Sequence, residues 1–179
     1  IYAHNFPNDT LIVGEDAHQY LLDHYDDGWT AIWSSPPCPT HSQMMKATRH
    51  DRREYPDMRL YQEILWLQHH YKGKWVVENV VGYYEPLIPA QICGRHLVWA
   101  NFHIPRVETP KPPGFINECT VSDSKEMQKW LGIYNPNKNV YVGGNHCPNQ
   151  IYRNAVAPIT GKQILEAAFA PDLFGEISA

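Results

Sequence analysis

The residues best suited to covalent chemistry follow a short hydrophobic run. The run from Ile32 to Ser35 leads into Pro36-Pro37-Cys38-Pro39, so three prolines surround a single thiol. Proline fixes its own φ angle and restricts the residue before it, and this makes the loop stiff. Enzymes with parallel sheets place reactive groups at strand ends, and a cysteine thiolate is an effective nucleophile. Cys38 is therefore the leading candidate for a nucleophile, with a buried structural thiol as the alternative.

A carboxylate occupies the corresponding place in a second hydrophobic run. Glu78 stands near the end of Trp75-Val76-Val77-Glu78-Asn79-Val80. Burying a carboxylate is costly unless it is paired or takes part in proton transfer. We therefore expect Glu78 and Cys38 to face one pocket. An alternative is an unrelated thiol enzyme in which His41 is the base for Cys38. This alternative is weaker, because it leaves Glu78 without a role.

Basic residues are concentrated just after this thiol. Five of the fifteen lysines and arginines fall in one short segment, namely Lys46, Arg49, Arg52, Arg53 and Arg59. One interpretation is a loop that grips phosphates, and the other is a solvated surface segment in which neighbouring acidic residues dilute the charge.

The hydrophobic pattern predicts alternating strands and helices. Strands are predicted at residues 9–14, 30–34 and 75–80, and helices at 17–25, 57–73 and 157–169. The second helix carries one buried stripe, formed by Leu60, Ile64, Leu67 and Tyr71. Strands that alternate with helices are typical of a parallel sheet in an α/β fold, whose strand ends share one edge. Asp16, Cys38 and Glu78 would meet there.

Composition favours one globular domain. The chain has 179 residues, of which 43% are hydrophobic, and a net charge of -4 that argues against indiscriminate nucleic-acid binding. No apolar run reaches membrane-spanning length and the start shows no secretion signal, so a cytoplasmic protein without a membrane partner is predicted. The four cysteines show no paired metal-ligand spacing, so no metal is predicted. The weak alternative is a zinc site of Cys93, His96, His146 and Cys147.

Several of these residues together resemble the cytosine-5 DNA methyltransferases, particularly the short enzymes of phages and prophages. Pro36-Pro37-Cys38 resembles the family's catalytic proline-cysteine loop, and Glu78-Asn79-Val80 resembles its glutamate-asparagine-valine motif. The segment from Arg95 to Phe102 is similar to the family's arginine-containing strand motif, and Asn154-Ala155-Val156 is similar to its last motif. The resemblance spans the chain apart from Val107 to Pro148.

The resemblance implies a fold and a domain plan. We expect a Rossmann-like S-adenosylmethionine-dependent methyltransferase sheet with helices on both faces, and a small loop-rich insertion. Residues 1–106 would form a partial catalytic domain, 107–148 a target-recognition region, and 149–179 a segment that packs back on the catalytic domain. In this family a glycine-rich cofactor loop lies upstream of the segment that Ile1 begins to match. We therefore expect an upstream segment or a second chain to supply the rest of the cofactor pocket.

The resemblance also implies roles for single residues. Cys38 would attack carbon 6 of a cytosine flipped out of double-stranded DNA, while Glu78 and Arg95 hold the base. S-adenosylmethionine would be held by Asp16, Pro36, Asn154 and Val156. The DNA backbone would be contacted from a lid by Ser42, Lys46, Arg49, Arg52 and Arg53. Two alternatives stay open: Asp16 as a simple helix cap, and the whole chain as an inactive or partner-dependent DNA-binding portion of such an enzyme.

Overall fold

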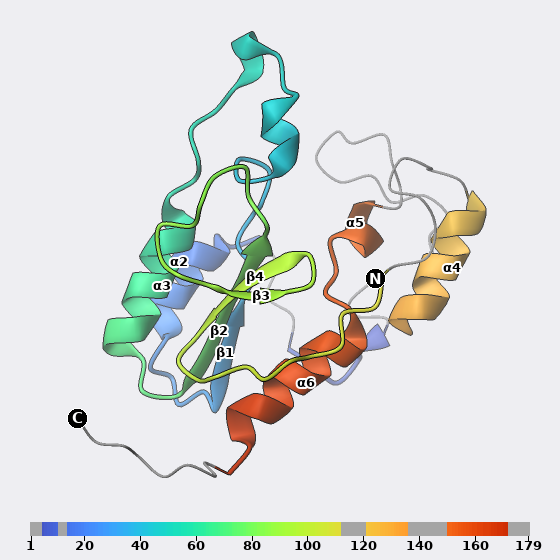
Figure 1. Ribbon diagram of the computed structural model, residues 1–179. Helices are drawn as coiled ribbons and strands as arrows, with labels where there is room; N and C mark the ends of the chain where they lie inside the picture. The colour runs from blue at the N-terminus through green and yellow to red at the C-terminus, as the bar shows by residue number, and fades with distance from the viewer. Residues whose placement is uncertain (1–4, 11–13, 112–120, 136–149, 172–179) are drawn as a thin grey trace. The chain divides into compact units, whose positions relative to one another are not determined.

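The computed structural model describes residues 5–10, 14–111, 121–135 and 150–171 (Figure 1). The chain divides into two compact units. One contains Glu15–Val107 and Gln163–Ala179, and the other contains Ile1–Gly14 and Glu108–Lys162. The fold is α/β, as predicted, and each unit is described by itself.

The first unit is built on a four-stranded sheet. Its strands are β1 (Ala31–Ser34), β2 (Lys74–Val80), β3 (Gln91–Cys93) and β4 (His96–Ala100), in the order β1-β2-β4-β3. β1 and β2 are parallel, with Ser34 beside Val77. β4 is antiparallel to both of its neighbours, so the sheet is mixed, and the predicted parallel arrangement holds for β1 and β2. The predicted strands at 30–34 and 75–80 are confirmed, whereas residues 11–13 of the first predicted strand lie outside the described residues.

The turn between β3 and β4 explains this reversal of direction. Only Gly94 and Arg95 separate the two strands, and a connection of two residues can join only antiparallel neighbours. Gly94 has a φ of 64°, in the left-handed region that glycine adopts without steric cost. The turn therefore fixes the place of Arg95 at the end of the sheet.

Helices pack on both faces of the sheet, as expected. α2 (Ala17–His24) and α3 (Arg59–His70) confirm two predicted helices, and α3 ends one turn before Gly73. The predicted α3 stripe is buried with Trp75, Val77, Leu97 and Trp99. The opposite face carries Val76 and Val98, which pack with Ile164 of α6 (Pro158–Phe169). Because successive residues of a strand point to opposite faces, the apolar run at 75–77 supplies both cores.

The second unit is helical in its described part. It contains α4 (Val121–Leu131), α5 (Gln150–Arg153) and the start of α6. Met127 and Leu131 of α4 are buried with Tyr152. The expected loop-rich insertion therefore contains an eleven-residue helix, which the sequence analysis missed because few of its residues are apolar. Within the described residues, no helix is long and apolar enough to cross a membrane.

Candidate active site

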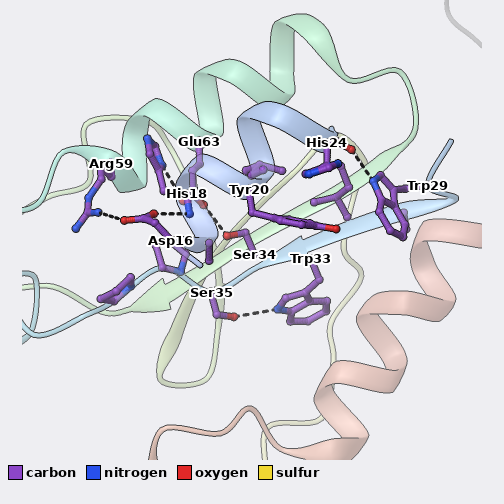
Figure 2. Close-up of a pocket in the computed structure, with 16 residues that line it drawn as sticks. Asp16, His18, Tyr20, His24, Trp29, Trp33, Ser34, Ser35, Arg59 and Glu63 are labelled. Atoms are coloured by element: carbon purple, nitrogen blue, oxygen red, sulfur yellow. Dashed lines mark hydrogen bonds and ion pairs between the residues drawn. The ribbon is translucent and has the colours of Figure 1, made fainter. Parts of the chain in front are cut away.

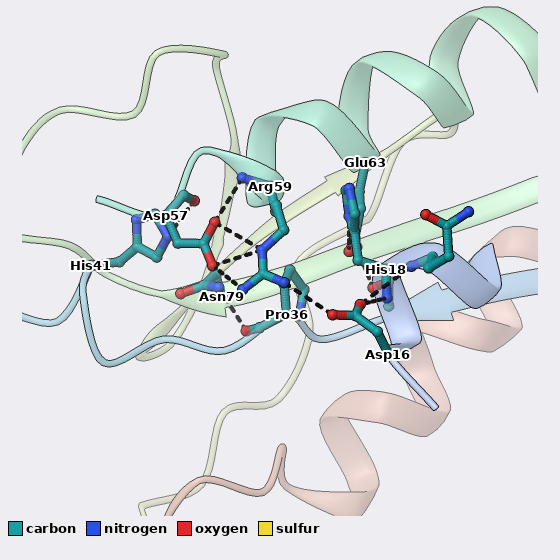
Figure 3. Close-up of polar contacts among 10 residues, drawn as sticks. Asp16, His18, Pro36, His41, Asp57, Arg59, Glu63 and Asn79 are labelled. Atoms are coloured by element: carbon teal, nitrogen blue, oxygen red, sulfur yellow. Dashed lines mark hydrogen bonds and ion pairs between the residues drawn. The ribbon is translucent and has the colours of Figure 1, made fainter. Parts of the chain in front are cut away.

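The loop that carries Cys38 is held in place by the backbone and by Asn79. The carbonyl of Cys38 accepts hydrogen bonds from the backbone N–H groups of His41 and Ser42, each at 3.0 Å. The Asn79 side-chain amide donates to the Pro36 carbonyl at 3.0 Å (Figure 3). Asn79 directly follows Glu78, so the proline-cysteine loop is tied to the strand that carries the carboxylate.

Glu78 lies near the end of β2 and is only 6% exposed. Its Oε1 atom is hydrogen-bonded to Nδ1 of His96, which is also buried. Arg95 Nε in turn donates to Nε2 of His96 at 3.2 Å. The carboxylate is thus paired, which is the condition under which such a group is buried at acceptable cost.

Electrostatics links the thiol to this carboxylate. Burial raises the pKa of the Cys38 thiol, and the charge of Glu78 raises it further. Partial burial lowers the pKa of Arg95, and the charge of Glu78 opposes that effect. The structure therefore brings Cys38, Glu78 and Arg95 together at one end of the sheet. Their catalytic roles stay predictions.

His41 is not placed as a base for Cys38. Its Nδ1 atom is hydrogen-bonded to the Tyr84 hydroxyl at 2.6 Å and its Nε2 atom to the Asp57 carbonyl at 3.1 Å (Figure 3 shows His41 beside Asp57). Burial lowers the pKa of His41. The side chain holds together the two ends of the segment between β1 and α3, and this argues against the alternative thiol enzyme.

A cavity of about 570 Å³ lies along β1, α2 and the start of α3 (Figure 2). Its volume is in the range of small-molecule sites. Two of the predicted cofactor residues, Asp16 and Pro36, line it. Aromatic rings of Tyr20, Trp29 and Trp33 supply flat apolar walls.

Asp16 caps α2. Its Oδ1 atom accepts from the backbone N–H groups of His18 and Gln19 at 2.9 and 3.2 Å, and Oδ2 accepts from Arg59 at 3.2 Å. The two backbone hydrogen bonds, and to a lesser degree Arg59, lower the pKa of Asp16. The helix-cap interpretation is therefore correct for this structure, and contact of Asp16 with a cofactor stays a prediction.

Glu63 is a residue that the sequence analysis missed. It is 5% exposed and lines the cavity from α3. The Ser34 hydroxyl donates to its Oε2 atom at 2.5 Å, and Nδ1 of His18 lies 3.0 Å from its Oε1 atom (Figure 2). A signal was present in the sequence, because Glu63 falls three residues after Leu60 and four before Leu67 on the buried stripe.

The basic segment extends beyond the sheet and carries two short 3-10 turns, Gln43–Lys46 and His50–Arg52 (Figure 1). Ser42 caps the first turn by accepting from the backbone N–H of Met44. Arg53 Nε donates to the Thr48 carbonyl at 3.4 Å. The cationic side chains predicted to contact DNA are all exposed, namely Lys46, Arg49, Arg52 and Arg53.

The other predicted residues belong to the second unit or lie outside the described residues. Asn154 is exposed in the turn between α5 and α6, and Val156 is half-buried. His146 and Cys147 of the alternative zinc site are not among the described residues. Within the described ranges, no three His, Cys, Asp or Glu side chains gather in a way that could hold a metal ion.

Comparisons with models of protein families, with curated proteins and with solved structures find no match.

Proposed function

We propose that this chain is the catalytic part of a DNA cytosine-5 methyltransferase, which transfers a methyl group from S-adenosylmethionine to carbon 5 of cytosine. The observation that carries the proposal is the placement of the two residues: Cys38 lies in the loop that follows β1, and Glu78 lies near the end of β2, the parallel neighbour of β1. A paired nucleophile and carboxylate at a strand end is what addition to a pyrimidine ring requires.

The proposed chemistry begins with the thiol. The Cys38 sulfur forms a bond to carbon 6 as its proton leaves, and the ring electrons move so that carbon 5 becomes nucleophilic. Bound S-adenosylmethionine supplies the methyl group that carbon 5 takes. Loss of the carbon 5 proton and of the Cys38 thiolate then restores the ring. Burial, and to a lesser degree the charge of Glu78, raises the pKa of Cys38 and so favours the protonated thiol before a base is bound.

Glu78 and Arg95 would hold the base. A carboxyl group can bind the amino group of cytosine and ring nitrogen 3, and protonation at nitrogen 3 favours the electron-rich adduct. Arg95 would bind the base oxygen or a nearby phosphate. A base inside a duplex is out of reach of these groups, so the cytosine must be flipped out. The exposed cations of the basic segment would bind the DNA backbone.

The cavity along β1 fits part of the cofactor. Its aromatic walls suit an adenine ring and its volume suits a ligand of this size. Pro36 would place the cofactor beside the Cys38 loop. Among the described strands β1 pairs with β2 alone, and the residues of β1 line the cavity.

The edge of β1 that no described strand pairs with favours a second candidate function, because another strand can pair with it. In this alternative the chain binds DNA but needs an upstream segment or a second chain to complete the cofactor pocket. Calorimetry with S-adenosylmethionine separates the two candidates. Clear affinity for the cofactor would count against the partner-dependent candidate.

The direct test is transfer of a labelled methyl group to DNA. Cys38→Ala should abolish transfer, while Cys93→Ala should retain it, because Cys93 is buried in β3 and would only lose packing. Methyl transfer by Cys38→Ala at the original rate would refute the proposed mechanism.

A further inference from the structure

His96 is buried against the proposed active site and has no role in the reaction as described so far. It is 6% exposed, and its backbone pairs with Val80 of β2. Glu78 is two residues from Val80, so the side chains of Glu78 and His96 project from the same face of the sheet. Val76 and Val98 belong to a hydrophobic cluster on this face. The hydrogen-bonded Glu78–His96 pair is the polar part of the same face.

The hydrogen bonds of His96 determine which ring nitrogen carries the proton. Arg95 Nε is a donor only, so Nε2 of His96 must accept and is unprotonated. The ring proton therefore lies on Nδ1, where it is donated to Oε1 of Glu78. The three side chains form a directed chain of hydrogen bonds from Arg95 through His96 to Glu78.

Two cysteines lie near these hydrogen-bonded side chains, and each belongs to the end of a strand or to the loop that follows one. Cys93 of β3 pairs with His96 across the β3–β4 hairpin, and the Cys38 thiol interacts with Glu78 from the loop after β1. Within the part of the chain that the structure describes, the hydrogen bond of the Glu78 carboxylate engages Oε1. His96 thus fixes the carboxylate through one oxygen and leaves Oε2 for a substrate.

We propose that His96 is a positioning residue that orients Glu78 and delivers to it the proton needed at nitrogen 3 of the base. This inference rests on the proposed function. When Arg95 turns to the base oxygen or a phosphate, Nε2 of His96 can accept a proton. The proton that Cys38 loses as its sulfur bonds to carbon 6 then reaches Nε2 through water. His96 passes its Nδ1 proton to Oε1 of Glu78, and the same Oε1 atom passes it to nitrogen 3 while Oε2 accepts from the amino group of the base, so protons balance and nothing is oxidised.

The first test reads the His96 proton directly and needs no enzymatic activity. In the chain labelled with ¹⁵N-histidine, long-range ¹H–¹⁵N spectra should show the neutral Nδ1–H form of His96, assigned by its disappearance in His96→Gln. In Arg95→Met, which removes the donor, the proton should distribute between both nitrogens. A resting His96 with the proton on Nε2 would overturn the inference whether or not the chain methylates DNA.

The second test separates orientation from proton delivery. His96→Gln can still donate a hydrogen bond to Glu78 but cannot carry a proton, whereas His96→Ala can do neither. We expect kcat to fall within about 10- to 100-fold, the range seen when partners that orient reactive ligands are removed, and to fall further in His96→Ala than in His96→Gln. The KM for DNA should be unchanged, and the pH dependence of kcat should lose one ionisation in His96→Gln. His69→Gln, an exposed histidine on α3, is the matched control.

Two outcomes distinguish failure of this inference from failure of the proposed function. An active original chain whose pH profile is retained in His96→Gln would overturn the role of His96 and leave the methyltransferase proposal standing. An original chain that forms no adduct with DNA and transfers no methyl group would overturn both, even with the expected tautomer.

Discussion

Two buried glutamates lie on opposite faces of one sheet, and each is hydrogen-bonded to Nδ1 of a histidine. Glu78 on β2 pairs with His96 on the face covered by α6. Glu63 on α3 pairs with His18 on the face covered by α2 and α3. The two carboxylates are equally buried, at 6% and 5% exposed. The same pair of side chains thus occurs twice. The two pairs differ in whether the second oxygen of the carboxylate also has a hydrogen-bond partner.

Glu63 has both oxygens occupied, one by His18 and one by the Ser34 hydroxyl. In the described residues Glu78 is bonded through Oε1, and its charge acts on a neighbouring thiol. A carboxylate with filled hydrogen-bonding positions stabilises a fold, because all its polar atoms are satisfied. A carboxylate with a position left for a ligand, beside a nucleophile, suits chemistry. Under the proposed function, Glu63 would therefore have a mainly structural role and Glu78 a reactive one.

The largest expected difference between the two glutamates is in methyl transfer. Glu78→Gln should lower kcat about 100- to 10,000-fold, because it removes proton transfer at the base. Glu63→Gln keeps hydrogen-bonding atoms for Ser34 and His18, so kcat should fall less than about tenfold, with the larger effect on the KM for S-adenosylmethionine. Rates of tritiated methyl transfer measure both. Equal losses of kcat would remove the distinction between the two sites.

The second difference is in stability. Ser34→Ala leaves a buried oxygen of Glu63 without its donor, and should lower the free energy of unfolding by about 1–3 kcal/mol. Urea unfolding followed by tryptophan fluorescence measures this change. Ser35→Ala is the control, because Ser35 is exposed and only accepts from Trp33 Nε1 at 3.1 Å. A destabilisation no larger than that of the control would show that the Ser34 hydrogen bond to Glu63 contributes little.

A smaller difference should appear in the reactivity of Cys38. Its raised pKa means that alkylation by iodoacetamide increases with pH later than for an ordinary thiol, because only the thiolate reacts. Glu78→Gln removes the negative charge that contributes to the shift, so alkylation at pH 8 should accelerate, by up to about tenfold. Glu63→Gln should not change it. Mass spectrometry of the Cys38 peptide gives the rate, and acceleration by both variants would mean that the thiol does not sense Glu78 specifically.

The smallest effect concerns DNA. Neither glutamate is expected to alter the salt dependence of binding, whereas Arg52→Gln should reduce the slope of log K against log salt by about 0.9, the effect of one lost phosphate contact. Fluorescence anisotropy at several salt concentrations measures the slope. Lys72→Gln is a control, because this exposed lysine follows α3, far in sequence from the basic segment. Equal slopes for the original chain and Arg52→Gln would remove Arg52 from the DNA-binding surface.

The sequence predicted the elements of the sheet unit because their signals are local. The stripe of α3 and the apolar run of β2 follow the periods of a helix and of a doubly covered strand, and both elements formed as predicted. The direction of β4 was not predicted, because it depends on the two-residue turn between β3 and β4. Helix α4 was missed because its buried face is formed by few apolar residues.

By itself the sequence determined that Cys38 and Glu78 stand at the ends of two strands, because proline stiffness and hydrophobic runs are properties of short segments. Only the tertiary structure decided what surrounds them. The pairing of Glu78 with His96, of Glu63 with Ser34 and His18, and of His41 with Tyr84 joins residues 18 to 45 positions apart in the sequence. Such contacts depend on strand register and on how helices pack, and these follow from burial of the whole core rather than from any local pattern.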